Sequence, residues 1–181
     1  MDLKILLALF RHLTIMSIEK GEIILQNGKA HREVYFIRKG LVRAYYTNEE
    51  GEEITFQLFP EYHVFGSFYS LLFDEPSRFT FQALERTKFY KVDFDSFHNV
   101  IQHSTVVNLN KLGVGKMAMK QAFQRVESLV LLTPEERYLK YMQDYPNVIN
   151  RVPDKYIAHV LGITPVSLSR IKGRITSKRQ N

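Results

Sequence analysis

Cysteine and tryptophan are both absent from this chain of 181 residues. Without cysteine the protein has no disulfide, no thiolate zinc site or iron–sulfur cluster, and no cysteine nucleophile. Long apolar runs are absent too, since none approaches the roughly 18 residues that a membrane-spanning helix needs. The N-terminal run Ile5–Phe10 is also shorter than the apolar region of a signal peptide. We therefore expect a cytoplasmic protein that makes no contact with a membrane.

The histidines are too scattered for a metal-dependent enzyme. A jelly-roll enzyme of the cupin type would need clustered histidines, and this chain has no His-x-His pair. It also lacks a P-loop, a dinucleotide-binding glycine pattern and a nucleophile–base arrangement. We predict no metal site, no catalytic residue, and a function other than catalysis. The six histidines are His12, His31, His63, His98, His103 and His159.

Positive charge is confined to one end of the chain. The net charge is +6, and residues 151–181 contain seven basic side chains against one acid, Asp154. Residues 1–150 contain equal numbers of acidic and basic side chains. A basic block of this kind is typical of a nucleic-acid-binding segment. The alternative is a basic tail that is merely solvated.

The N-terminal half has the pattern of short strands. Residues 3–13 repeat apolar side chains at helical spacing and predict a short amphipathic helix. From Gly21 to about Asp93, short runs alternate between turn signals such as Asn27-Gly28. The runs Ile54–Leu58 and Phe79–Ala83 alternate apolar with polar residues, as half-buried strands do. We predict an antiparallel β-roll or jelly roll.

Helical periodicity returns at about Phe94. Apolar residues then follow a heptad pattern that one lysine interrupts, which predicts a long helix that pairs with its copy in a dimer. The alternative is that this seam packs only on its own strands. The predicted fold class is α+β, with a β-roll at 1–100, a dimerisation helix at 101–131 and a DNA-binding domain at 132–181. The seam consists of Leu109, Leu112, Lys116, Met119, Phe123, Val126 and Val130.

Three further helix starts follow the seam. Thr133 is a candidate N-cap before Pro134 and two acids, and Asp154 is a candidate N-cap for a helix that Gly162 ends. Thr164 then caps another helix that begins at Pro165. The apolar residues of this pair predict two helices that cross closely through a tight turn, as in a helix-turn-helix. These residues are Ile157, Ala158, Leu161, Ile163, Leu168 and Ile171.

The second helix of the pair is the predicted recognition helix. Arg170 is the best candidate for a base contact, because a guanidinium pairs with guanine O6 and N7. Phosphate contacts suit Thr164, Ser167, Lys172, Arg174, Lys178 and Arg179. The residues expected to face DNA are Thr164, Pro165, Val166, Ser167, Ser169, Arg170, Lys172 and Arg174.

This order of elements resembles the Crp/Fnr family of bacterial transcription regulators. The segment Gly21–Gly28 is similar to the family's early strand and turn, and Val34–Arg43 is similar to the hairpin that follows. Phe65–Phe68 and Pro76–Arg78 occupy the place of the family's phosphate-binding cassette, and Thr164–Arg170 resembles its recognition helix. The resemblance implies a homodimer on duplex DNA, with a small-molecule effector and RNA polymerase as further partners.

The departures from the family affect the effector first. Ser67 stands where cyclic-AMP-binding members have a glutamate for the ribose, and Ser77-Arg78 reverses their Arg-Ser pair. Cyclic nucleotide binding is therefore disfavoured, and another small effector or none remains open; no cofactor is predicted. The candidate effector pocket consists of Phe65, Gly66, Ser67, Phe68, Ser77 and Arg78.

The departures also affect DNA contact. Pro165 and Val166 replace the Arg-Glu pair of the nucleotide-responsive members. We also expect the family's β-hairpin wing to be reduced or absent. We predict a dimeric, sequence-specific transcription regulator with a target sequence of its own. The alternative is a ligand-binding regulatory module whose helix-turn-helix serves protein contacts.

Overall fold

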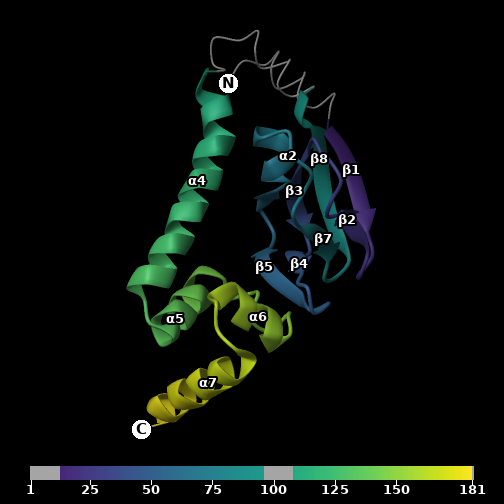
Figure 1. Ribbon diagram of the computed structural model, residues 1–181. Helices are drawn as coiled ribbons and strands as arrows, with labels where there is room; N and C mark the ends of the chain where they lie inside the picture. The colour runs from purple at the N-terminus through teal and green to yellow at the C-terminus, as the bar shows by residue number, and fades with distance from the viewer. Residues whose placement is uncertain (1–12, 96–107, 181) are drawn as a thin grey trace. The chain divides into compact units, whose positions relative to one another are not determined.

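The computed structural model describes residues 13–95 and 108–180, with the backbone alone over 108–118 and 178–180 (Figure 1). The chain divides into two compact units. The first comprises Met1–Tyr46 with Gln57–Lys120, and the second comprises Thr47–Phe56 with Gln121–Asn181.

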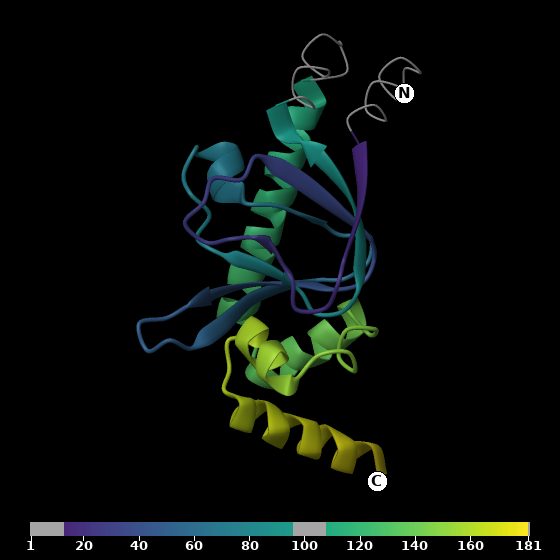
Figure 2. The same cartoon turned by 90° about the vertical axis from the view of Figure 1, so that its right-hand side faces the viewer.

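The first unit is an antiparallel β-roll of two four-stranded sheets, as the alternation predicts. One sheet has the order β1 (Leu13–Ile18), β8 (Thr87–Asp93), β3 (Glu33–Lys39) and β6 (Val64–Phe65). The other has the order β2 (Ile23–Leu25), β7 (Thr80–Ala83), β4 (Val42–Thr47) and β5 (Glu53–Phe59). Figure 2 shows these strands after a quarter turn, with β4 and β5 as a long hairpin.

The predicted helix at 3–13 lies outside the described residues except for its last position. Leu13 is the first residue of β1, where it pairs with Val92 of β8. Leu13 is therefore part of the sheet and not of a helix, because the strand pairing continues to that residue. The short helix α2 (Phe68–Leu72) follows β6.

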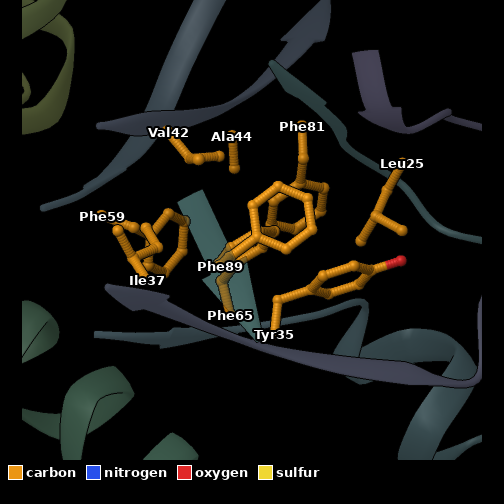
Figure 3. Close-up of a cluster of buried hydrophobic side chains, with 9 residues drawn as sticks. All are labelled: Leu25, Tyr35, Ile37, Val42, Ala44, Phe59, Phe65, Phe81 and Phe89. Carbon is orange, nitrogen blue, oxygen red and sulfur yellow. The ribbon is translucent and has the colours of Figure 1, made fainter. Parts of the chain in front are cut away.

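Nine buried side chains form the core between the two sheets, and five of them are aromatic (Figure 3). Phe65 is central: its ring centroid lies 4.9 Å from that of Tyr35 and 5.7 Å from those of Phe59 and Phe81. Phe89 meets Phe65 edge-on at 6.3 Å. Offset and edge-to-face ring pairs are the favourable geometries for aromatic side chains. The aromatic residues therefore fill the interior of the roll.

Gly40 is required where β3 turns into β4. Its φ is +113°, in the region that side chains with a Cβ rarely adopt. A Cβ at this position would also lie 2.7 Å from the Thr87 Cα. Both the backbone conformation and the close approach of β8 therefore demand glycine in this turn.

The helices of the second unit share one small core. The long helix α4 (Asn108–Leu131) enters this unit at Gln121, and three helices follow: α5 (Pro134–Asp144), α6 (Asp154–Leu161) and α7 (Pro165–Gln180). After Leu131 the described part of the chain contains helices and turns but no strand. The buried side chains are Tyr138, Val148, Val152, Ile157, Ala158, Leu161, Leu168 and Ile171. The predicted inward positions of the two helices α6 and α7 are thus confirmed.

Two helix starts show how far capping signals predict structure. At α5 the Thr133 hydroxyl accepts from the Glu136 amide at 3.3 Å, and the Glu136 carboxylate accepts from the Thr133 amide at 2.8 Å. The predicted cap at Thr133 is therefore confirmed, as a complete capping box. The predicted cap at Asp154 is wrong: Pro153 is the N-cap of α6, without a side-chain hydrogen bond, and Asp154 is the first helical residue. Its carboxylate binds Lys172 instead.

The tip of the β4–β5 hairpin belongs to the second unit and contacts its helices. Glu52 forms a 3.0 Å ion pair with Lys155 of α6, and this ammonium lowers the pKa of Glu52. The Thr55 amide donates to Nδ1 of His159 at 3.2 Å. These partners are about a hundred residues apart in sequence, and no local pattern predicted them.

Candidate nucleic-acid interface

A turn of three residues, Gly162–Thr164, joins α6 to α7. Gly162 ends α6 in the left-handed conformation, with φ of +66°, and the Ile163 amide donates to the carbonyl of Ala158 at 3.0 Å. Thr164 caps α7, because its hydroxyl accepts from the Ser167 amide at 3.1 Å. The turn therefore satisfies the backbone at both helix ends and fixes where α7 begins.

The hydroxyls of Thr164 and Ser167 bond each other, with their oxygens 2.9 Å apart. Thr164 is exposed and Ser167 is half-buried. Both hydroxyls thus serve the cap of α7, and their expected phosphate contacts stay a prediction.

The basic side chains of α7 differ in their partners. Lys172 binds the Asp154 carboxylate of α6, and Arg174 binds Glu135 of α5 at 3.1 Å. Arg170 is exposed, and its guanidinium forms no hydrogen bond or ion pair with any residue the structure describes. The side chains of Lys178 and Arg179 lie outside the description. Among the α7 cations whose side chains the structure describes, Arg170 is therefore the one available to an external partner.

Four exposed residues form one stripe along α7, here called the outer stripe: Val166, Ser169, Arg170 and Gly173. Their spacing of three and four residues places them on one face of the helix. Val166 is 61% exposed, although valine is apolar. Leu168 and Ile171, on the opposite face, are buried. The helix thus presents one face to the core and a short, chemically mixed face to solvent.

The C-terminal half of α4 has a solvent-exposed apolar seam. Met119, Phe123, Val126 and Val130 are 62%, 61%, 57% and 75% exposed. They repeat at the heptad spacing of a helix–helix interface. The first three seam positions, Leu109, Leu112 and Lys116, lie outside the described side chains. Apolar residues repeated in this way along an exposed helix mark an interaction surface.

The residues of the candidate effector pocket are part of the packing of the roll. Phe65 is 1% exposed at the centre of the core, and Gly66 is buried so tightly that a Cβ would lie 2.9 Å from the Glu33 carbonyl oxygen. Ser67 is buried as the N-cap of α2, where its hydroxyl accepts from both the amide and the hydroxyl of Ser70. Phe68 is the first residue of α2. Phe65, Gly66 and Ser67 are thus buried within the roll, and Phe68 is half-buried.

Ser77 and Arg78 also have internal partners. The Ser77 hydroxyl donates to the Phe79 carbonyl at 2.7 Å. The Arg78 guanidinium lies 3.4 Å from the Glu75 carboxylate and 4.4 Å from the centre of the Tyr69 ring. Its side chain is 63% exposed and outside the core of the roll.

These observations bear on whether the roll fits a cyclic nucleotide. A cyclic phosphate needs a cation aimed at the ligand, and Arg78 is directed to Glu75 and Tyr69. A ribose needs a hydrogen-bonding partner, and the Ser67 hydroxyl is buried in a helix cap. The interior space is filled by Phe65 and its aromatic neighbours. The residues present do not fit a cyclic nucleotide.

Two other expectations concern metals and membranes. Among the described residues, no three histidine, aspartate or glutamate side chains gather as a metal site. No helix in residues 13–95 or 108–180 is both long and apolar enough to cross a membrane.

The sequence and the fold were then compared with known proteins. Residues 15–104 match the family model of the cyclic nucleotide-binding domain. A search among curated proteins gave no match. The chain thus has the antiparallel jelly roll of a cyclic nucleotide-binding domain, followed by helices.

The solved structures that share this fold include Crp/Fnr-type regulators. FixK2 from Bradyrhizobium japonicum has a TM-score of 0.78 at 18% identity, over 92% of this chain and 85% of that chain. A CooA mutant from Carboxydothermus hydrogenoformans has a TM-score of 0.67 at 20% identity, over 93% and 78%. The catabolite activator protein of Thermus thermophilus has a TM-score of 0.56 at 19% identity, over 97% and 83%.

The acids that bind α7 were not anticipated from the sequence. Asp154 appeared to be a helix cap, and Glu135 appeared only as a first-turn acid of α5. For Asp154 the signal that could have indicated an ion pair is its charge, since it is the single acid of residues 151–181. That charge does not reveal which lysine or arginine it meets.

Proposed function

We propose that this protein is a dimeric, sequence-specific DNA-binding transcription regulator. The observation that supports it most is Arg170 on the outer stripe of α7, which is exposed and has no partner among the described residues. In a helix-turn-helix, the N-terminal residues of the second helix contact base edges in the major groove. The net charge of +6 on residues 151–181 would attract the DNA backbone.

The dimer uses the apolar seam of α4. Two copies of Met119, Phe123, Val126 and Val130 would cover each other in a parallel helix pair. A two-fold dimer presents two copies of α7, so the target site is a two-fold repeat of one half-site. The seam thus determines the symmetry of the DNA site.

Within each half-site Arg170 contacts a guanine. A guanidinium donates two parallel hydrogen bonds to guanine O6 and N7, an arrangement that the other bases do not offer. Lys172 and Arg174 pair with Asp154 and Glu135, so they position α7 on its own domain. Their contacts to phosphate require that these ion pairs open.

The β-roll acts without a cyclic nucleotide. Its core is complete without a ligand, and its cassette residues are satisfied by internal partners. A small effector of another kind, and contact with RNA polymerase, remain predictions from the family resemblance.

The proposed function is tested by selecting bound fragments from random duplex DNA. The wild type should enrich a two-fold symmetric motif, with affinity that falls steeply as salt rises. Arg170→Ala should relax the preference at one base pair of each half-site and cost about 1–3 kcal/mol for each lost base contact.

A matched control is Arg86→Ala, since Arg86 is an exposed arginine of the roll that pairs with Glu19 at 3.1 Å. It should leave the selected motif unchanged. No enrichment by the wild type, with affinity for duplex DNA that is flat in salt, would refute the proposal and favour a helix pair that serves protein contacts.

A further inference from the structure

Two residues of the outer stripe, Val166 and Gly173, lower the stability of α7. Valine is β-branched and glycine has no side chain, and both disfavour the helical conformation relative to alanine. Neither is required by packing inside the protein. Val166 is 61% exposed, and a Cβ built at Gly173 would meet nothing within 4 Å.

Residues that disfavour their own secondary structure and make no stabilising contact within the protein are expected at functional surfaces. Val166 and Gly173 lie on the same helix face as Ser169 and Arg170, since the spacings are three, four and seven residues. This face is opposite the buried residues Leu168 and Ile171. The two unfavourable choices therefore occur on the surface where Arg170 is free to bind an external partner.

Resting on the proposed DNA-binding function, we propose that Val166 recognises thymine through the C5-methyl group of that base. Thymine presents an oxygen acceptor and a methyl group in the major groove, and an aliphatic side chain can pack only on the methyl. Val166 is the second residue of α7, in the first turn, where base contacts occur. Gly173 complements it, because the absence of a side chain lets the DNA backbone approach α7 closely.

The position of the thymine follows from helix geometry. Val166 and Arg170 are four residues apart, or about 6 Å along the axis of an α-helix. Base pairs are stacked about 3.4 Å apart. The half-site therefore contains a thymine about two base pairs from the guanine that Arg170 contacts.

The test uses the operator obtained from the selection and replaces single thymines of both half-sites by deoxyuridine. This exchange removes the methyl group and keeps the oxygen acceptor. For the wild type, exchange of the contacted thymine should weaken binding about fourfold in each half-site, as expected for one methyl group that is no longer buried. Binding is measured by fluorescence anisotropy.

Val166→Ala should bind the thymine and deoxyuridine operators equally. Arg170→Ala is the matched control, and it should keep the penalty for deoxyuridine while it loses the preference for guanine. If the wild type binds its operator and no thymine exchange weakens binding, the contact by Val166 is refuted while the proposed function stands. If the wild type selects no operator at all, both are refuted.

Gly173→Ala provides a second measurement that misfolding cannot imitate. Alanine should raise the thermal midpoint of the free protein, because it favours the helix and has open space around it. The same variant should lose affinity for the operator. A higher thermal midpoint with unchanged affinity would refute the close approach of DNA at Gly173.

Discussion

Phe123 offers the most direct test of the dimer, because its side chain lies in the middle of the exposed seam of α4. We expect Phe123→Ala to weaken self-association without loss of folding. The ring is 61% exposed, so the protein's own core gains little from it. A partner helix would cover this exposed part.

The magnitude follows from the exposed fraction. Complete burial of a large apolar side chain is worth about 1.5–3 kcal/mol, and 61% of it is about 1–2 kcal/mol in each protomer. A two-fold interface contains two copies of the ring, so the variant should lose about 2–4 kcal/mol per dimer. At 1.4 kcal/mol per tenfold change, the dissociation constant should rise about 30-fold to 700-fold.

Analytical ultracentrifugation over a dilution series measures this constant. The matched control is Gln124→Ala, since Gln124 is an exposed neighbour on α4 outside the heptad seam. Its dissociation constant should equal that of the wild type. A wild type that is monomeric at every concentration, or equal constants for Phe123→Ala and the wild type, would refute the seam as the dimer interface.

Three further predictions concern stability and charge. Phe65→Ala should destabilise the protein by about 3–5 kcal/mol in urea unfolding, because a ring that is 1% exposed leaves a cavity; a loss near zero would contradict the filled core. Glu135→Gln should free Arg174 for phosphate and steepen the slope of log affinity against log salt by about 0.9 per protomer; an unchanged slope would place Arg174 away from DNA. The hydrogen bond from the Thr133 amide lowers the pKa of the Glu136 carboxyl in the folded protein. The ionised carboxylate therefore stabilises the fold above the ordinary carboxyl pKa of about 4.3, and this stabilisation is lost as the pH falls through the lowered pKa of the folded state. Glu136→Gln should remove this acid dependence from urea unfolding curves, and an identical dependence in both proteins would refute the assignment.

Fewer basic side chains of α7 are available to an external partner than the net charge of the C-terminal segment suggests. Of the cations on α7 whose side chains the structure describes, Lys172 and Arg174 pair with acids of the same domain. These pairs are at the surface, where ion pairs contribute little to stability. Their effect is to orient α7 against α5 and α6, and to leave Arg170 as the side chain with the freest access to a base.

The sequence by itself determined the features that depend on near neighbours. Alternation of apolar and polar residues indicated the strands, because a strand turns successive side chains to opposite faces. Thr133 indicated the start of α5, and Gly162 indicated the end of α6, because caps are made within a few residues. The same local logic failed at Asp154, since a carboxylate at a helix start can bind a distant cation instead of the helix backbone.

Only the tertiary structure decided which candidate residues remain available for function. Ser67 and Ser77 resembled ligand contacts, yet their hydroxyls are bound inside the roll. Lys172 meets Asp154 across 18 positions, and Arg174 meets Glu135 across 39. These partners are brought together by the packing of separate elements, and no periodicity in the sequence encodes such a distance. For the same reason, the sequence did not show that Phe65 and its neighbours fill the roll, because these side chains come from strands of both sheets.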